Sequence, residues 1–414
     1  MDFKFHGKYS NAFNHIDKYY NFRFNVVSHQ YEFRKIKGLG SFNNWIKFDD
    51  RQKNSIVLDL LATNIECPSN MINTFIESPD FSKDYNPFKT YFENLKPYKS
   101  KKDYISKFAS TIDVEDRERF EDIFKRFLVG TINCLLNENS TNDVCLVFQA
   151  GQGIGKTRWM RSLLPKQFQA EYIYEGHIDT RNKDHNLYLS QYWFIHLDEL
   201  ETLKSNEIGA IKAYITRERI NERVAYARHT SNFVRRASFL GSVNDDKFLS
   251  DTTGNRRWLV FKVLGVNYQH GLNTDKLWAQ AYDLYKSGYR SWFNTDEIKG
   301  INSANEEFRE ISMEEELIMR FFDYKKKSKD GQYFSSSEMA QLISYNVPEF
   351  NSKINIRTIG KVNAKFCKNK KRASGINKYW CTYTGKELLG ELQSLQNNNK
   401  NNDFIDPKND DLPF

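Results

Sequence analysis

The sequence predicts an α/β fold in which a parallel β-sheet carries helices on its faces. Three observations lead to this prediction. A glycine-rich loop at residues 150–157 follows a short apolar run and precedes a helix-like stretch. Two further apolar runs, 192–197 and 237–243, end in polar residues. Continuous apolar runs of this length are typical of strands buried on both faces, and polar residues at their carboxyl ends mark the ligand-binding edge of open α/β sheets.

The glycine-rich loop has the composition of a phosphate-binding loop. It reads AGQGIGKT, with the apolar run 144–148 before it and the helix-like stretch 158–164 after it. Glycines let successive backbone N–H groups face phosphate oxygens, and the helix N-terminus adds partial positive charge. Lys156 would reach the β- and γ-phosphates and Thr157 would bind Mg²⁺, so ATP and Mg²⁺ are the expected cofactors. The residues assigned to the nucleotide are Gly151, Gln152, Gly153, Ile154, Gly155, Lys156 and Thr157.

The loop departs from the phosphate-binding pattern at one position. Ala150 stands where the pattern has a glycine, a departure for which Gly151 and Gly153 could compensate. The alternative is a glycine-rich turn that binds nothing.

Polar residues at the ends of the next two strands would complete the site. The run 192–197 ends in Asp198 and Glu199, and the run 237–243 ends in Asn244. Asp198 would hold Mg²⁺ directly or through water, Glu199 would polarise the attacking water, and Asn244 would hydrogen-bond the water and the γ-phosphate. The simpler alternatives are that many buried strands end in an acid and that Asn244 only starts a turn.

A pair of arginines precedes the next apolar strand. Residues 251–258 read DTTGNRRW and lead into the run 259–261. Arg256 and Arg257 suit an arginine finger, which stabilises transition-state charge on the phosphate of a neighbouring subunit. A salt-bridged surface pair is the alternative.

The order of these pieces resembles the virulence-associated protein E family, whose members are superfamily 3-like AAA+ ATPases of phages, plasmids and integrated elements. The resemblance is strongest over residues 144–261 and weaker at 20–27, 49–55 and 85–88. It implies an AAA+ P-loop ATPase core that acts as an ATP-driven DNA helicase or replication initiator. It also implies a homo-oligomeric ring, a hexamer, on single-stranded or forked DNA in a bacterial host cell.

Members of superfamily 3 also carry a hairpin that enters the central pore. Here the corresponding interval is 217–236, where alternation about residues 223–227 indicates a strand and residues 229–232 indicate a turn. The tip would carry Arg228 and His229, which would contact DNA phosphates. Arg235 and Arg236 would serve the nucleotide site or a subunit interface. A solvated strand face is the alternative for any single arginine here.

Four segments make up the expected domain organisation. Residues 1–110 form a mixed α/β N-terminal region with a hairpin over 22–34 and helices over 49–61 and 88–95. Residues 111–310 form the ATPase domain, with a helical lead-in over 116–136, a helix over 274–286 and a connector over 292–304. Residues 311–390 form a winged helix and 391–414 a disordered tail. We find no catalytic constellation before Val144, so a primase within this chain is not expected.

The predicted winged helix consists of helices over 313–322, 335–344 and 356–367 and a β-ribbon over 368–383. Four-residue spacing puts Arg357, Lys361 and Lys365 on one helix face, which suits a DNA groove. The ribbon adds Lys370, Lys371 and Arg372. A winged helix that contacts proteins instead is the alternative.

The tail is rich in Asn and Lys and ends in Asp410, Asp411, Leu412, Pro413 and Phe414. These residues resemble the tip of bacterial single-stranded DNA-binding proteins, which implies docking to host replication proteins. A chance apolar end is the alternative.

The composition agrees with this interpretation. The chain has 414 residues and a formal net charge of +8, which suits a polyanionic partner. Its five cysteines are scattered, so neither zinc nor disulfides are expected, and no apolar run approaches ~18 residues. We expect a cytoplasmic protein without a membrane segment. Two rival functions remain: an AAA+ loader or remodeller on DNA that does not unwind it, and a P-loop phosphotransferase acting on a small molecule.

Overall fold

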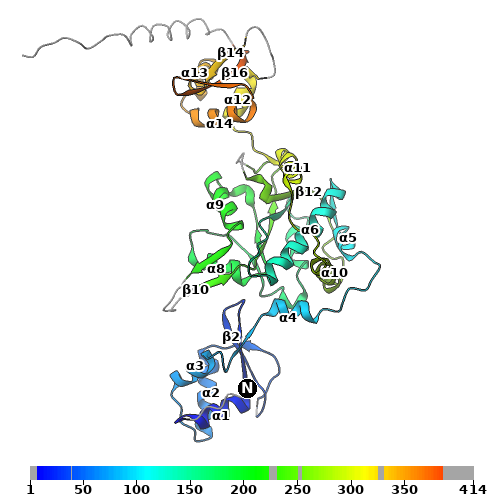
Figure 1. The fold of residues 1–414 in the computed structure, drawn as a ribbon, viewed down its shortest axis with the longest axis vertical. Coiled ribbons are helices and arrows are strands. Elements are labelled where there is room, and N and C mark those ends of the chain that lie inside the picture. Colours follow the sequence, from blue (N-terminus) through cyan, green and yellow to red (C-terminus); the bar gives the residue numbers. More distant parts are fainter. Residues whose placement is uncertain (1–6, 39, 223–230, 250–253, 325–330, 386–414) are drawn as a thin grey trace, which may run out of the picture. The chain divides into compact units, whose positions relative to one another are not determined.

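The computed structural model describes residues 7–38, 40–222, 231–249, 254–324 and 331–385. The chain divides into two compact units, Met1–Arg309 and Glu310–Phe414 (Figure 1). Within the described ranges, no helix combines the length and the apolar character that crossing a membrane requires.

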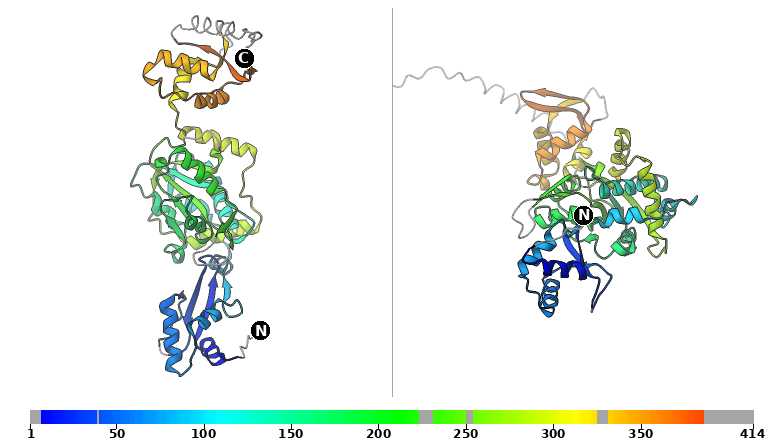
Figure 2. Two further views of the ribbon diagram at one scale, coloured as in Figure 1. Left: turned by 90° about the vertical axis from the view of Figure 1, so that its left-hand side faces the viewer. Right: turned by 60° about the horizontal axis from the view of Figure 1, so that its bottom comes forward.

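The first unit begins with a small mixed α/β part. Its sheet has the strand order β3-β2-β1-β4, and β1 pairs antiparallel with β2, which confirms the predicted hairpin. Helices α1, α2 and α3 share an apolar core with the hairpin strands (Figure 2). The Asp49 side chain caps α2 by accepting a hydrogen bond from the backbone N–H of Gln52, which confirms the predicted helix start. The elements are α1 (Ser10–Tyr19), β1 (Tyr20–Asn25), β2 (Gln30–Lys35), β3 (Ile46–Lys47), α2 (Asp50–Ala62), α3 (Ser69–Glu77), β4 (Lys83–Tyr85) and α4 (Pro87–Asn94).

The larger sheet of this unit has the strand order β5-β12-β6-β11-β8-β7. All neighbours are parallel except β5, which runs antiparallel to β12. The predicted parallel sheet is therefore confirmed. Because β11 lies between β6 and β8, the carboxyl ends of these three strands meet at one edge. The strands are β5 (Ile112–Val114), β6 (Cys145–Gln149), β7 (Ile173–Glu175), β8 (Phe194–Leu197), β11 (Ser238–Val243) and β12 (Trp258–Val266).

Helices cover both faces of this sheet (Figure 1). Leu146 and Phe148 of β6 join a core with α4, α5, α6, α7 and α10, whereas Cys145 and Val147 join a second core with α8 and α9. Alternate residues of one strand thus serve opposite faces, as a pleated strand requires. The helices are α5 (Tyr104–Ala109), α6 (Arg117–Leu136), α7 (Lys156–Ser162), α8 (Lys183–Gln191), α9 (Ser205–Ile215), α10 (Thr274–Lys286) and α11 (Thr295–Asn305), and the short 3-10 helices are η1 (Lys166–Phe168), η2 (Leu200–Thr202), η3 (Asn255–Arg257) and η4 (Glu306–Phe308).

The connector predicted over 292–304 is wrong, because α11 occupies most of that range. Asn294 and Glu297 form a reciprocal capping box that starts the helix. A glycine and several short polar residues weaken the apolar periodicity of this segment, so the capping pair was the signal that could have revealed it.

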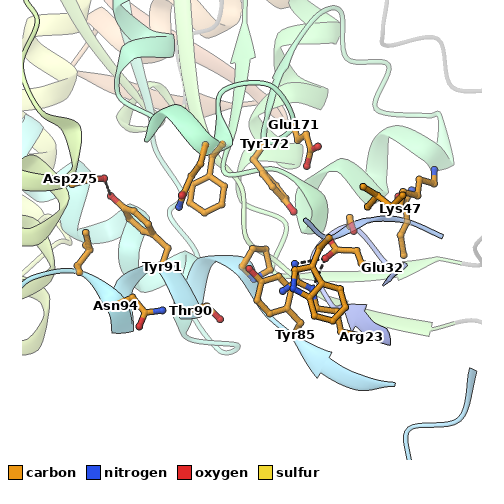
Figure 3. Close-up of a pocket in the computed structure, with 18 residues that line it drawn as sticks. Arg23, Glu32, Lys47, Tyr85, Thr90, Tyr91, Asn94, Glu171, Tyr172 and Asp275 are labelled. Carbon is orange, nitrogen blue, oxygen red and sulfur yellow. Dashed lines mark hydrogen bonds and ion pairs between the residues drawn. The ribbon is translucent and has the colours of Figure 1, made fainter. Parts of the chain in front are cut away.

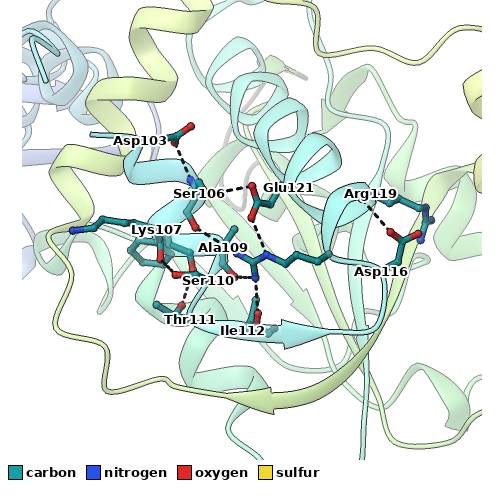
Figure 4. Close-up of polar contacts among 12 residues, drawn as sticks. Asp103, Ser106, Lys107, Ala109, Ser110, Thr111, Ile112, Asp116, Arg119 and Glu121 are labelled. Carbon is teal, nitrogen blue, oxygen red and sulfur yellow. Dashed lines mark hydrogen bonds and ion pairs between the residues drawn. The ribbon is translucent and has the colours of Figure 1, made fainter. Parts of the chain in front are cut away.

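The helical lead-in supports the glycine-rich loop. Arg117, at the start of α6, donates hydrogen bonds to the carbonyls of Ala109 at 2.6 Å and Ile112 at 3.0 Å (Figure 4). These bonds tie α6 to α5 and to β5. Thr111 in the same segment accepts a 2.6 Å hydrogen bond from the indole N–H of Trp159 on α7. The helix that follows the loop is thereby fixed to the lead-in.

The predicted hairpin between β8 and β11 is present in its two strands. β9 (Arg219–Glu222) pairs antiparallel with β10 (Ser231–Val234). The turn predicted over 229–232 is wrong in part, because Ser231 and Asn232 pair with Glu222 and Asn221 inside the ladder. The expected tip residues Arg228 and His229 lie outside the described residues.

Arg235 fills the core below this hairpin. It is 1% exposed and donates hydrogen bonds to the carbonyls of Ile215, Arg217 and Ala237 at 2.8–3.0 Å. Arg236 is also buried and donates to the carbonyl of Leu135. The expectation that these arginines serve a nucleotide site or a subunit interface is therefore wrong, because both guanidinium groups are buried and donate hydrogen bonds to backbone carbonyls of the same unit.

Replacement of Arg235 by leucine should destabilise the first unit. Three carbonyls would lose their donor, and the lost bonds predict a fall of about 3 kcal/mol in the free energy of unfolding. Urea denaturation followed by circular dichroism measures this value. Arg181→Leu, at an exposed position, is the matched control and should leave the midpoint unchanged. An unchanged midpoint for Arg235→Leu would contradict the structural role.

The second unit packs three predicted helices against an antiparallel sheet. Its core includes Ile318, Phe334, Ile343, Ile359 and Tyr379. The sheet has the order β13-β16-β14, with β15 pairing β16, so the predicted helices and ribbon are confirmed. The elements are α12 (Met313–Phe321), β13 (Phe322–Asp323), β14 (Gln332–Ser335), α13 (Ser336–Asn346), η5 (Pro348–Phe350), α14 (Ile356–Phe366), β15 (Lys370–Ala373) and β16 (Ile376–Tyr383).

Candidate phosphate-binding site

The glycine-rich loop joins β6 to α7. Of the residues predicted to bind the nucleotide, those from Gly151 to Gly155 lie in the loop, and Lys156 and Thr157 are the first two residues of α7. Gly153 has φ 86° and Gly155 has φ 98°, a region that side chains disfavour. A Cβ atom on Gly155 would also collide with the ring of Tyr268, so glycine is needed there. Ala150 has no positive φ. Its departure from the glycine pattern therefore falls where any residue fits the backbone.

Lys156 is the buried cation of this loop, with 7% of its surface exposed. Its Nζ donates hydrogen bonds to the carbonyl of Gly151 at 3.1 Å and to Oδ1 of Asn244 at 3.0 Å. Burial lowers the pKa of Lys156, and the carboxylates of Asp198 and Glu201 oppose that shift. The structure thus brings together two residues that are 88 positions apart in the sequence.

Asn244 links this lysine to an acid that the sequence analysis did not identify. Its Nδ2 donates a 2.8 Å hydrogen bond to Oε1 of Glu201, and its backbone N–H donates to the same oxygen at 3.2 Å. Lysine can only donate and a carboxylate can only accept, so the orientation of the amide is fixed from both sides. The other oxygen of Glu201, Oε2, is buried and accepts no hydrogen bond from the described residues.

Glu201 lies three residues after Asp198, in η2. Because η2 turns the chain back toward the sheet, the third acid of the run faces the end of β11. The only signal in the sequence was a third carboxylate close behind the predicted pair.

Asp198 is oriented by a short chain of hydrogen bonds across the sheet. Its Oδ1 accepts from the hydroxyl of Ser242 on β11, and Ser242 contacts Nε2 of His196 at 3.1 Å. Since the serine hydroxyl donates to the carboxylate, Nε2 of the histidine is the donor to the serine. Burial lowers the pKa of His196.

Glu199 differs from both neighbouring acids. Its backbone has φ 51°, in the left-handed region, and its side chain is exposed. Its carboxylate makes no hydrogen bond or ion pair with the described residues. A non-glycine residue in this conformation costs about 1 kcal/mol, and such strain is concentrated at functional sites.

The two arginines predicted as a finger lie far from this cluster. Arg256 and Arg257 are in η3, immediately before β12, and Trp258 pairs with Cys145 at the first residue of β6. The arginines are therefore at the opposite edge of the sheet from the glycine-rich loop. Asn305 holds their segment by donating to the carbonyl of Trp258 at 2.9 Å. Within one chain, the structure does not bring them to Lys156.

A cavity of about 850 Å³ lies between the N-terminal sheet and the region of α4 and η1 (Figure 3). The guanidinium of Arg23 stacks between the rings of Trp45, at 4.2 Å, and Tyr85, at 3.4 Å. Arg23 also donates a 2.6 Å hydrogen bond to Glu32. This ion pair cancels the charge of the arginine, and none of the predicted site residues lines the cavity.

The residues predicted to bind DNA are exposed where the structure describes them. Arg357, Lys361 and Lys365 are exposed on α14, and residues 370–372 are exposed on β15. The tail residues Asp410, Asp411, Leu412, Pro413 and Phe414 lie outside the described residues, as do Arg228 and His229.

Comparison with known proteins identifies one family. The Virulence-associated protein E-like domain matches residues 93–310. Among solved structures, the apo structure of the NrS-1 C-terminal region (305–718) is 13% identical, with a TM-score of 0.50, and covers 92% of this chain and 100% of that chain. An A form apo structure of the same region is 13% identical, with a TM-score of 0.49, and covers 90% and 98%. No curated protein matches the sequence. At 13% identity, the likeness to the first structure concerns the fold alone.

Proposed function

The chain belongs to the Virulence-associated protein E-like domain family, and on that premise we propose that it is an ATP-driven DNA helicase or replication initiator of a phage or mobile element. The observation that carries this proposal is the contact between Lys156 and Asn244. It places a buried cation and an oriented amide next to a glycine-rich loop, close to the acids that follow strand β8. That arrangement suits the γ-phosphate of a nucleoside triphosphate.

The residues at this edge fit ATP with Mg²⁺. The loop backbone and Lys156 would hold the phosphates, and Thr157 with Asp198 would hold the metal ion. Mg²⁺ would neutralise part of the phosphate charge. The unsatisfied Oε2 of Glu201 is a further acceptor for metal-bound water or a ligand hydroxyl. Asn244 would keep the lysine aimed at the phosphates, and the water-polarising role falls to Glu199.

The finer assignments follow from the same proposal. The first unit would contain the AAA+ P-loop core, and the second would be a winged helix that contacts DNA through α14 and β15. The position of Arg256 and Arg257, opposite the glycine-rich loop, supports their action on the nucleotide of a neighbouring subunit in a ring. The protein would work in the host cytoplasm, and its tail would dock to host replication proteins.

Unwinding of a labelled forked DNA tests this function. With ATP and Mg²⁺ the protein should separate the strands, and with a non-hydrolysable analogue it should not. Subunits carrying Arg256→Ala, inactive alone, should regain activity when mixed with inactive Lys156→Ala subunits, because each supplies the part that the other lacks. ATP hydrolysis without strand separation would favour the DNA-bound loader or remodeller. Hydrolysis unaffected by any nucleic acid would favour the small-molecule phosphotransferase.

A further inference from the structure

The second unit contains a long segment of one charge sign. Residues 351–385 contain nine lysines and arginines and no aspartate or glutamate. Seven of these cations are spread over α14, β15 and β16, and Lys353 and Lys368 lie in the segments before and after α14. Such a segment attracts polyanions, and its two structural parts offer two different surfaces. The cations are Lys353, Arg357, Lys361, Lys365, Lys368, Lys370, Lys371, Arg372 and Lys378.

The strand register assigns aromatic and basic side chains to the face of the sheet opposite the one that is buried in the core. Tyr333 pairs with Trp380, and Lys371 pairs with Lys378. Directly paired residues share a face, as do residues two apart on one strand, so these four residues form one surface. Phe334, Tyr379 and Cys381 alternate with them and are buried in the core with the helices. We call the first set the ribbon face.

The side chains of the ribbon face contact one another. The rings of Tyr333 and Trp380 lie 5.0 Å apart at 68°, and Nζ of Lys371 is 4.0 Å from the Tyr333 centroid. Lys378 is paired with Glu338 at 3.1 Å, whereas Lys371 has no acidic partner among the described residues. Both rings are half-buried and lie outside the apolar core. The surface therefore combines aromatic groups with an available cation.

We propose that the ribbon face binds single-stranded nucleic acid. Unpaired bases would stack on Trp380 and Tyr333, and Lys371 would contact a backbone phosphate. Stacking of this kind requires bases that are not already stacked in a duplex. Helix α14 packs on the core through Ile359 and Val362. The exposed cations of this helix would instead contact duplex phosphates. This inference rests on the proposed action on nucleic acid, but it requires neither ATP hydrolysis nor a ring.

Binding of the full chain to a fluorescein-labelled oligothymidylate, measured by anisotropy without nucleotide, tests the proposal. Trp380→Leu should weaken this binding about tenfold and leave binding to a short blunt duplex unchanged. An oligouridylate should respond in the same way, because both probes present unpaired bases on a phosphodiester backbone. Trp292→Leu, which removes a 63% exposed tryptophan from the first unit, is the matched control and should change neither affinity.

Further variants separate stacking from damage to the fold. Trp380→Phe should restore most of the affinity, because an aromatic ring is retained. Lys371→Gln keeps both rings and should lower the slope of log affinity against log salt by about 0.7 for the single strand. Trp380→Leu that melts like the wild type and binds oligothymidylate as tightly would overturn the proposal, and so would equal losses on oligothymidylate and duplex. Wild-type protein that binds oligothymidylate through Trp380 but never hydrolyses ATP would overturn the proposed function alone.

Discussion

Lys156→Ala is expected to lower ATP turnover about a thousandfold. The side chain is buried at the mouth of the glycine-rich loop, where its charge is aimed at the edge that would receive the phosphates. A cation in a dry, preorganised position stabilises the charge that develops on a transferring phosphoryl group, and such contacts are worth ~10²–10³ in rate. Phosphate release under saturating ATP and Mg²⁺ measures the loss.

The control for this variant is Lys166→Ala. Lys166 is exposed in η1, shortly after the helix that begins at Lys156, and its loss should leave turnover unchanged. Thermal denaturation should show that both variants remain folded. Wild-type turnover by Lys156→Ala would remove the main support for a nucleotide site at this loop.

The glycine-rich loop and the polar residues after each strand could be predicted because each depends only on residues that are adjacent in the sequence. A loop that needs positive φ at Gly153 and Gly155 must contain glycine there, and an apolar strand and a helix must flank it. The same holds for the acids after β8 and for Asn244 after β11, since each follows directly from a buried strand. These assignments needed only the pattern of neighbouring residues.

The contacts between these parts could not be predicted in the same way. Asn244 meets Lys156 because β11 is inserted between β6 and β8, and strand order depends on the packing of the whole unit. Glu201 enters the site because η2 turns after Glu199. The burial of Arg235 likewise depends on the carbonyls of Ile215 and Arg217, which lie 20 and 18 residues earlier in the chain, whereas its sequence context suggested a surface role.

The three acids that follow β8 differ in the hydrogen bonds that their carboxylates accept. Asp198 accepts a hydrogen bond from Ser242, and Glu201 accepts two from Asn244. Glu199 is the acid of this group whose carboxylate makes no hydrogen bond or ion pair with the described residues. A group that is to accept a proton from water must not already be satisfied by the protein. The geometry therefore favours Glu199 for the attacking water and Glu201 for positioning Asn244.

Glu199→Gln should accordingly reduce turnover by ~10²–10³ while ATP binding is retained, because the amide keeps the shape of the side chain and loses only its basicity. Glu201→Gln should act differently. Its oxygen can still accept from Asn244, so turnover at saturating ATP should fall only about tenfold, and ATP binding should become tighter because a negative charge beside the phosphate site is lost. Steady-state kinetics and binding of a fluorescent ATP analogue distinguish the two patterns, and Glu171→Gln, at an exposed acid, serves as the matched control.

A glycine substitution separates strain from chemistry at the same position. Because Glu199 has φ 51°, Glu199→Gly should relieve about 1 kcal/mol of backbone strain and raise the melting temperature. It should nevertheless lose as much turnover as Glu199→Gln, since both variants lack the carboxylate. If Glu201→Gln instead stops turnover with ATP still bound, while Glu199→Gln hydrolyses ATP at the wild-type rate, the roles of the two acids are exchanged. In that case the buried Oε2 of Glu201 is the atom that polarises the water.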